Sequence, residues 1–158
     1  MRIIRIDERL IHGQVIIGWI EATSIRTLTL IHDNMNTHYI NLYRNMIDPD
    51  IEFLTVNISS DDYQFTDREN ALFIIEDIDT LSDNCSIIDL IKPNLINIGG
   101  IRHDKYDIDL LDFVKLTNAE ANELIELQNH YSDIKFNARE LPDSKEHNII
   151  KLIRKHLQ

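Results

Sequence analysis

The chain has 158 residues, of which 43% are hydrophobic and 27% are charged, and this length and composition predict one globular domain, residues 1–158. Sixteen basic and twenty-seven acidic residues give a formal net charge of −11, which repels phosphate backbones and disfavours nucleic acid as a partner. Any phosphate bound by this chain must therefore be held locally, by particular side chains and backbone groups.

Targeting and redox signals point to a cytoplasmic protein. No apolar run approaches the roughly 20 residues that span a bilayer. Charged residues interrupt the apolar core that a signal peptide needs near the N-terminus: Arg2, Arg5, Asp7, Glu8 and Arg9. A lone cysteine, Cys85, excludes an internal disulfide framework and fits a reducing compartment.

Short apolar runs alternate with segments of helical period, which is typical of a mostly parallel sheet covered by helices. In chain order, strands are predicted at residues 2–6, 27–31, 51–56, 71–75, 94–98, 112–116 and 134–139. Helices are predicted at residues 13–22, 39–47, 79–91, 117–131 and 144–157, the fourth opened by a capping box from Thr117 to Glu120. Residues 57–70 hold at most a short helix, and residues 101–111 carry no predicted element. The pattern predicts an α/β fold with an open, mostly parallel, seven-stranded sheet.

The junction between the first strand and the first helix carries the most informative chemistry. The strand breaks into a charged pair, Asp7-Glu8, followed by Arg9, and His12 then precedes Gly13 at the predicted helix start. Backbone N–H groups converge at a helix N-terminus and favour an anion there. One interpretation is that His12 carries phosphate. The alternative is a polar loop that happens to contain one of the seven histidines.

Two further strand ends are expected at the same edge of the sheet. Asp33 follows the second predicted strand, and Gly99-Gly100 follow the fifth. In open α/β sheets, ligands bind beyond the carboxyl ends of the strands, so these residues should lie on the side of His12. Gly13, Gly99 and Gly100 would allow close backbone approach or positive φ, as a phosphate cradle needs. A simple tight turn is the alternative for Gly99-Gly100.

The unbroken stretch Asp7-Glu8-Arg9-Leu10-Ile11-His12-Gly13-Gln14-Val15, with Trp19 four residues further on, resembles the hallmark of one transporter family. This is the IIB component of mannose/fructose/sorbose-type systems in the phosphoenolpyruvate-dependent sugar phosphotransferase system. Further matches along the chain are Asp33, Asn97-Ile98-Gly99-Gly100, Leu116-Thr117 with Glu120, and a closing strand and helix. The resemblance spans essentially the whole chain.

The resemblance implies seven mostly parallel strands with helices on both faces. It also implies a role as a phosphocarrier enzyme, in which His12 accepts a phosphoryl group from a phosphohistidine of a IIA protein. The group then passes to a sugar of the mannose/fructose/sorbose/amino-sugar class, held by the membrane components IIC and IID. The protein would act at the inner face of the membrane, with no metal or organic cofactor. The resemblance suggests Nδ1 of His12 as the phosphorylated atom, with Nε2 as the alternative.

Chemistry gives the neighbouring residues expected roles. A neutral imidazole is a competent nucleophile near neutral pH, and Arg9 could present a planar donor fork to the phosphoryl oxygens. The N–H groups of Gly13 and Gln14 would add the contribution of the helix terminus. Asp7 is expected to orient Arg9 or to bind the loop, and Glu8 is expected to be a solvated loop residue. The supporting residues at the sheet edge are Asp33, Asn97, Gly99 and Gly100.

Other motifs and functions have weaker support in the sequence. No histidine pair has metal-ligand spacing with partner carboxylates or cysteines, and neither a nucleophile elbow nor a phosphate-loop lysine motif is present. His32 is expected in a surface loop, and four other histidines are expected to be solvated: His103, His130, His147 and His156. Two alternative functions remain. One is a non-transporting regulatory or binding module that reads the phosphorylation state of a partner protein. The weaker one is a phosphohydrolase, for which no general base for water stands out.

Overall fold

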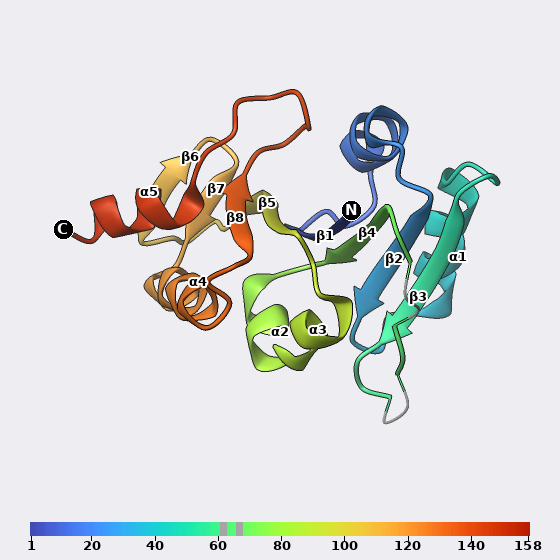
Figure 1. The fold of residues 1–158 in the computed structure, drawn as a ribbon, viewed down its shortest axis with the longest axis horizontal. Coiled ribbons are helices and arrows are strands. Elements are labelled where there is room, and N and C mark those ends of the chain that lie inside the picture. The colour runs from blue at the N-terminus through green and yellow to red at the C-terminus, as the bar shows by residue number, and fades with distance from the viewer. Residues whose placement is uncertain (61–62, 66–67) are drawn as a thin grey trace.

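The computed structural model describes residues 1–60, 63–65 and 68–158, which fold around one open sheet (Figure 1). Its strands are β1 Arg2–Asp7, β2 Thr27–His32, β3 Glu52–Asn57, β4 Ala71–Ile75, β5 Leu95–Arg102, β6 Ile108–Leu111, β7 Val114–Leu116 and β8 Lys135–Ala138. The strand order is β3-β2-β4-β1-β5-β7-β6, and β8 also pairs with β5. Among the strand pairs of the described residues, β6 with β7 is antiparallel and the others are parallel. The predicted α/β class with an open, mostly parallel sheet is confirmed.

The strand count differs from the seven that the sequence predicts, because the described residues hold eight. The additional strand is β6, which falls in residues 101–111, where no element was predicted. Strand β5 is also longer than predicted, since it continues through Gly99-Gly100 to Arg102. Its first part pairs with β8, and Ile101 and Arg102 then pair with β7. The alternative of a tight turn at Gly99-Gly100 is therefore wrong.

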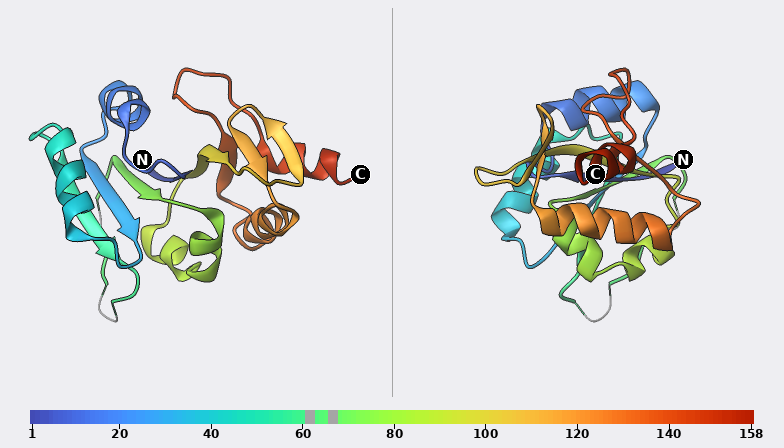
Figure 2. Two further views of the ribbon diagram at one scale, coloured as in Figure 1. Left: turned by 180° about the vertical axis from the view of Figure 1, so that it is seen from behind. Right: turned by 90° about the vertical axis from the view of Figure 1, so that its left-hand side faces the viewer.

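Helices cover both faces of the sheet, as the resemblance implied. They are η1 Gln14–Glu21, α1 Thr37–Met46, α2 Ile78–Asp83, α3 Ser86–Ile91, α4 Asn118–His130 and α5 Ile149–His156, of which η1 is a π-helix. Figure 2 shows η1 on one side of the sheet and α2, α3 and α4 on the other. Each side has its own core: Trp19 belongs to the one under η1, while Leu81 and Leu124 belong to the other.

Strand β1 runs between these two cores, and its side chains alternate between them. Ile4 and Ile6 pack in the core with α2, α3 and α4, whereas Ile3 packs in the core with η1. Arg5 is fully buried, and its guanidinium lies over the ring of Trp19, with Cζ 5.2 Å from the ring centroid. Successive side chains of a strand point to opposite faces, so Asp7 follows Arg5 on the η1 face. This places a buried charge directly before the His12 loop.

Two predicted helices are shorter than expected. The segment 79–91 forms two helices because the Asn84 side chain donates to the backbone carbonyl of Thr80 (2.9 Å), competing with the helical ladder. The last helix begins after Asn148, whose side chain accepts the N–H of Lys151, and not at residue 144. His147 instead forms an antiparallel bridge with Ala138. The capping box at the start of α4 is present as predicted.

The segment after β3 carries no helix at residues 58–60, 63–65 and 68–70, and the rest of the short helix expected in 57–70 lies outside the described residues. Across the part of the chain that the structure describes, every helix is too short or too polar to traverse a bilayer.

Candidate functional site

The loop between β1 and η1 places His12 beyond the carboxyl end of the central strand. Its chain turns back at Leu10, whose φ is 52° and whose N–H donates to the carbonyl of Asp7 (2.9 Å). The left-handed residue of this loop is thus a leucine, while Gly13 has φ −53°. The expectation that Gly13 supplies positive φ is wrong. A Cβ added to Gly13 would meet nothing within 4 Å, so open space lies above it.

The imidazole of His12 is half-buried and held at both ring nitrogens. Nδ1 lies 3.0 Å from the carbonyl oxygen of Leu10. Nε2 lies 3.4 Å from Oε1 of Gln14 and 3.8 Å from Oδ2 of Asp7. The side chain retains 19% of its exposure. An incoming group can therefore reach the ring, whose resting orientation is set chiefly by the 3.0 Å contact with the Leu10 carbonyl.

Arg9 lies beside His12 because both side chains bind Gln14. Nη2 of Arg9 donates to Oε1 of Gln14 (2.8 Å), the same oxygen that faces Nε2 of His12. Asp7 holds Arg9 from below, since its Oδ1 accepts the Arg9 backbone N–H (3.1 Å) and Nε (3.4 Å). The orienting contact expected from Asp7 to Arg9 is present, and Gln14 contributes its side chain as well as its position at the helix start.

A buried arginine, which the sequence analysis did not single out, anchors this arrangement. Arg5 Nη2 donates to Oδ2 of Asp7 (2.8 Å), and both side chains are fully buried. Burial lowers the pKa of Arg5 to about 10, against the opposing effect of Asp7, so the Arg5 guanidinium stays charged at neutral pH. Neutralising Asp7 in this way reduces its repulsion of an anion at the loop above. The sequence does hold one signal for Arg5: it is a charged residue inside an apolar strand, two residues before Asp7 and on the same face.

Asn97 supports Arg5 from the neighbouring strand. Its Oδ1 accepts Nη1 of Arg5 (2.6 Å), and its Nδ2 donates to Oδ1 of Asn137 (2.8 Å). All three side chains are buried, and the pairing of β1 with β5 sets Arg5 opposite Asn97. Asn97 thus acts two contacts away from His12, through Arg5 and Asp7.

The two glycines of β5 serve close packing and not a backbone cradle. A Cβ on Gly99 would lie 2.1 Å from Cζ of Arg5, so only glycine leaves room for the buried guanidinium. A Cβ on Gly100 would lie 3.5 Å from Nη2 of Arg9 and 3.5 Å from Oδ1 of Asp7. Neither glycine has positive φ. The close approach at Gly99 is that of a protein side chain, so the role expected for these glycines in a phosphate cradle stays a prediction, and the expectation of positive φ is wrong.

Glu8 is not the solvated residue that the sequence suggested. Its Oε2 accepts the backbone N–H of Arg102 (2.8 Å), and its Oε1 lies 3.8 Å from Nη1 of Arg102. Arg102 also pairs with Glu140 (3.0 Å), which ties the His12 loop to the end of β5 and to the loop after β8. Sequence reasoning missed Arg102 because its partners are 94 and 38 residues away.

Asp33 lies at the same edge but in a separate hollow. It lines a cavity of about 300 Å³ together with Leu10 of the His12 loop and Tyr39 of α1. Its Oδ1 accepts a hydrogen bond from the hydroxyl of Ser59. No contact between Asp33 and His12 is found among the described residues. Asp33 thus lies at the predicted edge of the sheet. Among the described residues, however, it does not support His12 directly.

The remaining histidines have other partners. His32 is the last residue of β2 and is buried, so its expected place in a surface loop is wrong; burial lowers its pKa, and its Nδ1 accepts the N–H of Met35 (3.1 Å). His103 is paired with the buried carboxylate of Glu120 (2.7 Å) and is not simply solvated. Within residues 1–60, 63–65 and 68–158, no group of three histidine, cysteine or acidic side chains is placed to hold a metal.

Comparison with known proteins identifies the family of this chain. The family model described as the sorbose-subfamily IIB component of the phosphotransferase system matches residues 1–158. No curated protein matches the chain.

Solved structures share the fold at low identity. The manxB structure from Thermoanaerobacter tengcongensis is 24% identical with a TM-score of 0.79, covering 100% of this chain and 99% of its own. An N-acetylgalactosamine IIB component, agaV, from Streptococcus pyogenes is 20% identical with a TM-score of 0.77, covering 96% and 97%. The IIBSor domain of the Klebsiella pneumoniae sorbose permease is 19% identical with a TM-score of 0.72, covering 98% of both chains. Since the family model spans every residue, the chain belongs to the sorbose-subfamily IIB components of the phosphotransferase system, whose role is phosphoryl transfer in sugar uptake.

Proposed function

We propose that His12 is the residue on which this IIB component carries its phosphoryl group. The observation that carries the proposal is the grouping of an accessible imidazole, the Arg9 guanidinium and a helix start around open space at Gly13. Among the described residues, the backbone N–H groups of Gly13 and Gln14 make no hydrogen bond, whereas those of Val15 and Ile16 donate to the His12 carbonyl. These two donors and the nearby arginine are available to phosphoryl oxygens, which supports the proposal.

The reaction consists of two transfers. In the first, a ring nitrogen of neutral His12 attacks the phosphorus held by a phosphohistidine of the IIA protein; a new N–P bond forms as the donor's N–P bond breaks. In the second, a sugar hydroxyl attacks the same phosphorus, its proton passes to solvent, and His12 leaves as neutral imidazole. Catalysis rests on positioning and charge stabilisation, supplied by Arg9 and the loop N–H groups. Gln14 positions Arg9 and His12 against each other.

The resting orientation of His12 sets a condition on which nitrogen reacts. Nδ1 donates to the Leu10 carbonyl in this orientation, so reaction at Nδ1, the atom that the resemblance implies, requires the ring to turn away from Leu10. Reaction at Nε2, the alternative, requires only that the contact with Gln14 open. Nitrogen-15 NMR of the phosphorylated protein distinguishes the two atoms by their shifts.

The acceptor system belongs to the same proposal. The sugar is of the mannose/fructose/sorbose/amino-sugar class and is held by membrane components IIC and IID. The protein therefore works in the cytoplasm, bound peripherally to the inner face of the membrane through that transporter. No metal or organic cofactor enters either transfer.

The test is phosphorylation with phosphorylated IIA and its upstream donors, followed by mass spectrometry. The wild type should gain one acid-labile phosphate, and His12→Ala should gain none. His130→Ala, which removes an exposed histidine on α4, is the matched control and should be labelled normally. Labelling of His12→Ala would overturn the assignment. A labelled wild type that forms no sugar phosphate with membranes carrying IIC and IID would favour the regulatory module instead.

A further inference from the structure

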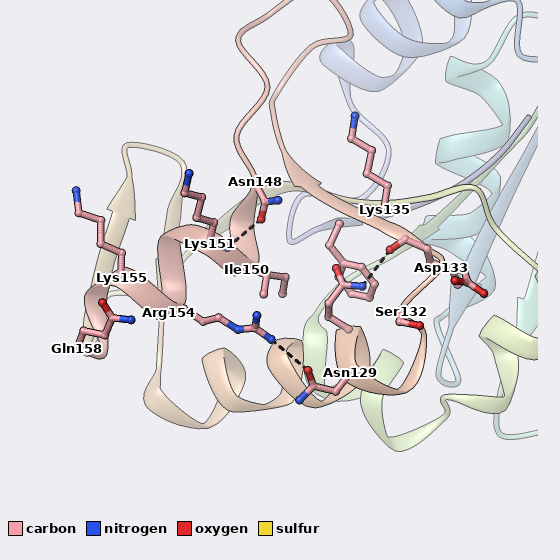
Figure 3. A pocket seen from close by; sticks show the side chains of 13 residues that line it. Asn129, Ser132, Asp133, Lys135, Asn148, Ile150, Lys151, Arg154, Lys155 and Gln158 are labelled. Atoms are coloured by element: carbon pink, nitrogen blue, oxygen red, sulfur yellow. Dashed lines mark hydrogen bonds between the residues drawn. The ribbon is translucent and has the colours of Figure 1, made fainter.

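A groove of about 870 Å³ lies far from His12, between the end of α4, strand β8 and helix α5 (Figure 3). Four basic side chains line it, namely Lys135 from β8 and Lys151, Arg154 and Lys155 from α5, against one acidic residue, Asp133. Figure 3 shows the three lysines projecting to the same side. The groove is therefore a positively charged patch on a chain whose net charge is −11.

The groove offers hydrogen-bond donors that have no partner among the described residues. Oδ1 of Asn148 accepts the N–H of Lys151 (2.9 Å), and Oδ1 of Asn129 accepts Nη2 of Arg154 (3.1 Å). Both asparagine acceptors are thus used within the protein. In the part of the chain that the structure describes, the ammonium groups of Lys151 and Lys155 and the two asparagine amide nitrogens make no hydrogen bond or ion pair. A complementary ligand must be anionic and rich in acceptor oxygens.

The spacing of the free cations indicates the form of that ligand. Lys151 and Lys155 are one helical turn apart, about 6 Å along the axis of α5. Alternate side chains of an extended polypeptide repeat at about 6.6 Å on one face. Carboxylates two residues apart on one face of such a segment match the rise between Lys151 and Lys155, so that each ammonium group can take its own carboxylate. The apolar floor of the groove, which includes Phe136 and Ile150, suits the side chains between them.

We propose that this groove binds an extended acidic segment of a partner protein, with carboxylates at alternate positions. Two such carboxylates pair with Lys151 and Lys155, and the amide nitrogens of Asn129 and Asn148 donate to backbone carbonyls of the segment. Lys135 is already paired with Glu146 (2.5 Å), so it is not a free donor for the ligand. This binding is independent of phosphoryl transfer at His12.

The test uses two fluorescein-labelled threonine-based decapeptides of equal charge, followed by fluorescence anisotropy. One carries four glutamates at alternate positions, and the other carries four glutamates spaced three apart. The first should bind at least threefold more tightly. Lys151→Glu/Lys155→Glu should weaken its binding about tenfold, because each charge reversal replaces an attraction with a repulsion. Lys92→Glu/Lys105→Glu, which makes the same charge change at exposed sites outside the groove, is the matched control and should bind as the wild type does.

Each other outcome overturns the proposal. Equal affinity for the two peptides would show that the groove attracts anions in general and does not recognise the spacing of the carboxylates. Absence of peptide binding, together with groove-dependent binding to phosphatidylglycerol vesicles, would assign the groove to a membrane surface. Self-association that is lost in Lys151→Glu/Lys155→Glu would assign it to a second copy of the chain. Phosphorylation of the same variants separates this proposal from the one for His12, because the groove variants should be labelled normally and His12→Ala should bind the peptide.

Discussion

The molecule has two clusters of positive charge on an acidic chain, and they are built in opposite ways. Under the His12 loop, the guanidinium groups of Arg5 and Arg9 are bound to the side chains of Asp7, Asn97 and Gln14. In the groove beside α5, Lys151 and Lys155 have no ionic partner among the described residues. The first arrangement fixes the positions of the side chains around His12, as transfer of a phosphoryl group demands. The second leaves charge free for a ligand.

The comparison predicts that the arginine cluster determines stability. Arg5→Met leaves the Asp7 carboxylate buried without its main partner, so we expect a loss of about 3–5 kcal/mol in the free energy of unfolding. Urea denaturation measures it. Arg5→Met/Asp7→Asn removes the unpaired charge as well and should lose less than the single variant. A single variant within about 1 kcal/mol of the wild type would show that the pair does not anchor the loop.

Gly99 gives the next largest effect. In Gly99→Ala the new methyl would lie 2.1 Å from the buried Arg5 guanidinium, so Arg5 or β5 must shift, at an expected loss of about 1–3 kcal/mol. Gly13→Ala is the control, because its φ is −53° and nothing lies within 4 Å of the added atom. Its urea midpoint should match or exceed that of the wild type. Equal midpoints for both variants would contradict the close packing at Gly99.

The sequence predicted what local pattern determines. The strand-like segments at residues 27–31 and 71–75 predicted β2 and β4 within a residue, and the motif around His12 placed the loop between β1 and the first helix. Strand β6 was missed because Ile108-Asp109-Leu110-Leu111 is short and lies at the edge of the described sheet, where it pairs with the next strand, β7, across a tight turn. Four residues give too little alternation to separate a strand from a loop.

The support of the site could not be predicted for a different reason. Arg5 reaches Asn97 across 92 residues, and Glu8 reaches Arg102 across 94. Which residues meet depends on the register between β1 and β5, which shifts after Ile6. A one-residue change in register would exchange the buried face for the other, so no local pattern specifies these partners. Arg9 and Gln14 could be assigned because they lie within three residues of His12.

A pH effect arises at neither positive cluster but at the contact of α2 with α4. Burial, reinforced by Asp79, raises the pKa of Glu123 to about 7. The folded state therefore retains a proton that the unfolded state loses near pH 4.5, and stability contributed by this group falls as pH rises from about 4.5 through 7. Glu123→Gln should be more stable than the wild type at pH 8 by about 1 kcal/mol, a value reduced for the solvent that reaches this half-buried carboxyl.

Urea midpoints measured between pH 4 and pH 8 check this effect. Glu126→Gln, an exposed neighbour on α4, removes the same charge and should show no such trend. A constant difference between Glu123→Gln and the wild type across this range would show that Glu123 titrates normally.

The smallest expected change in stability is at the groove. Lys151→Glu/Lys155→Glu alters two exposed side chains that contact no described acidic group, so its free energy of unfolding should stay within about 0.5 kcal/mol of the wild type. Any loss should shrink at high salt, because charges exposed to water are screened beyond about 10 Å at 0.1 M. Urea denaturation at low and high salt measures both quantities. A loss comparable to that of Arg5→Met would mean that the lysines, like the arginines, hold the fold together, and the groove would then no longer be a surface whose charge is free for a partner.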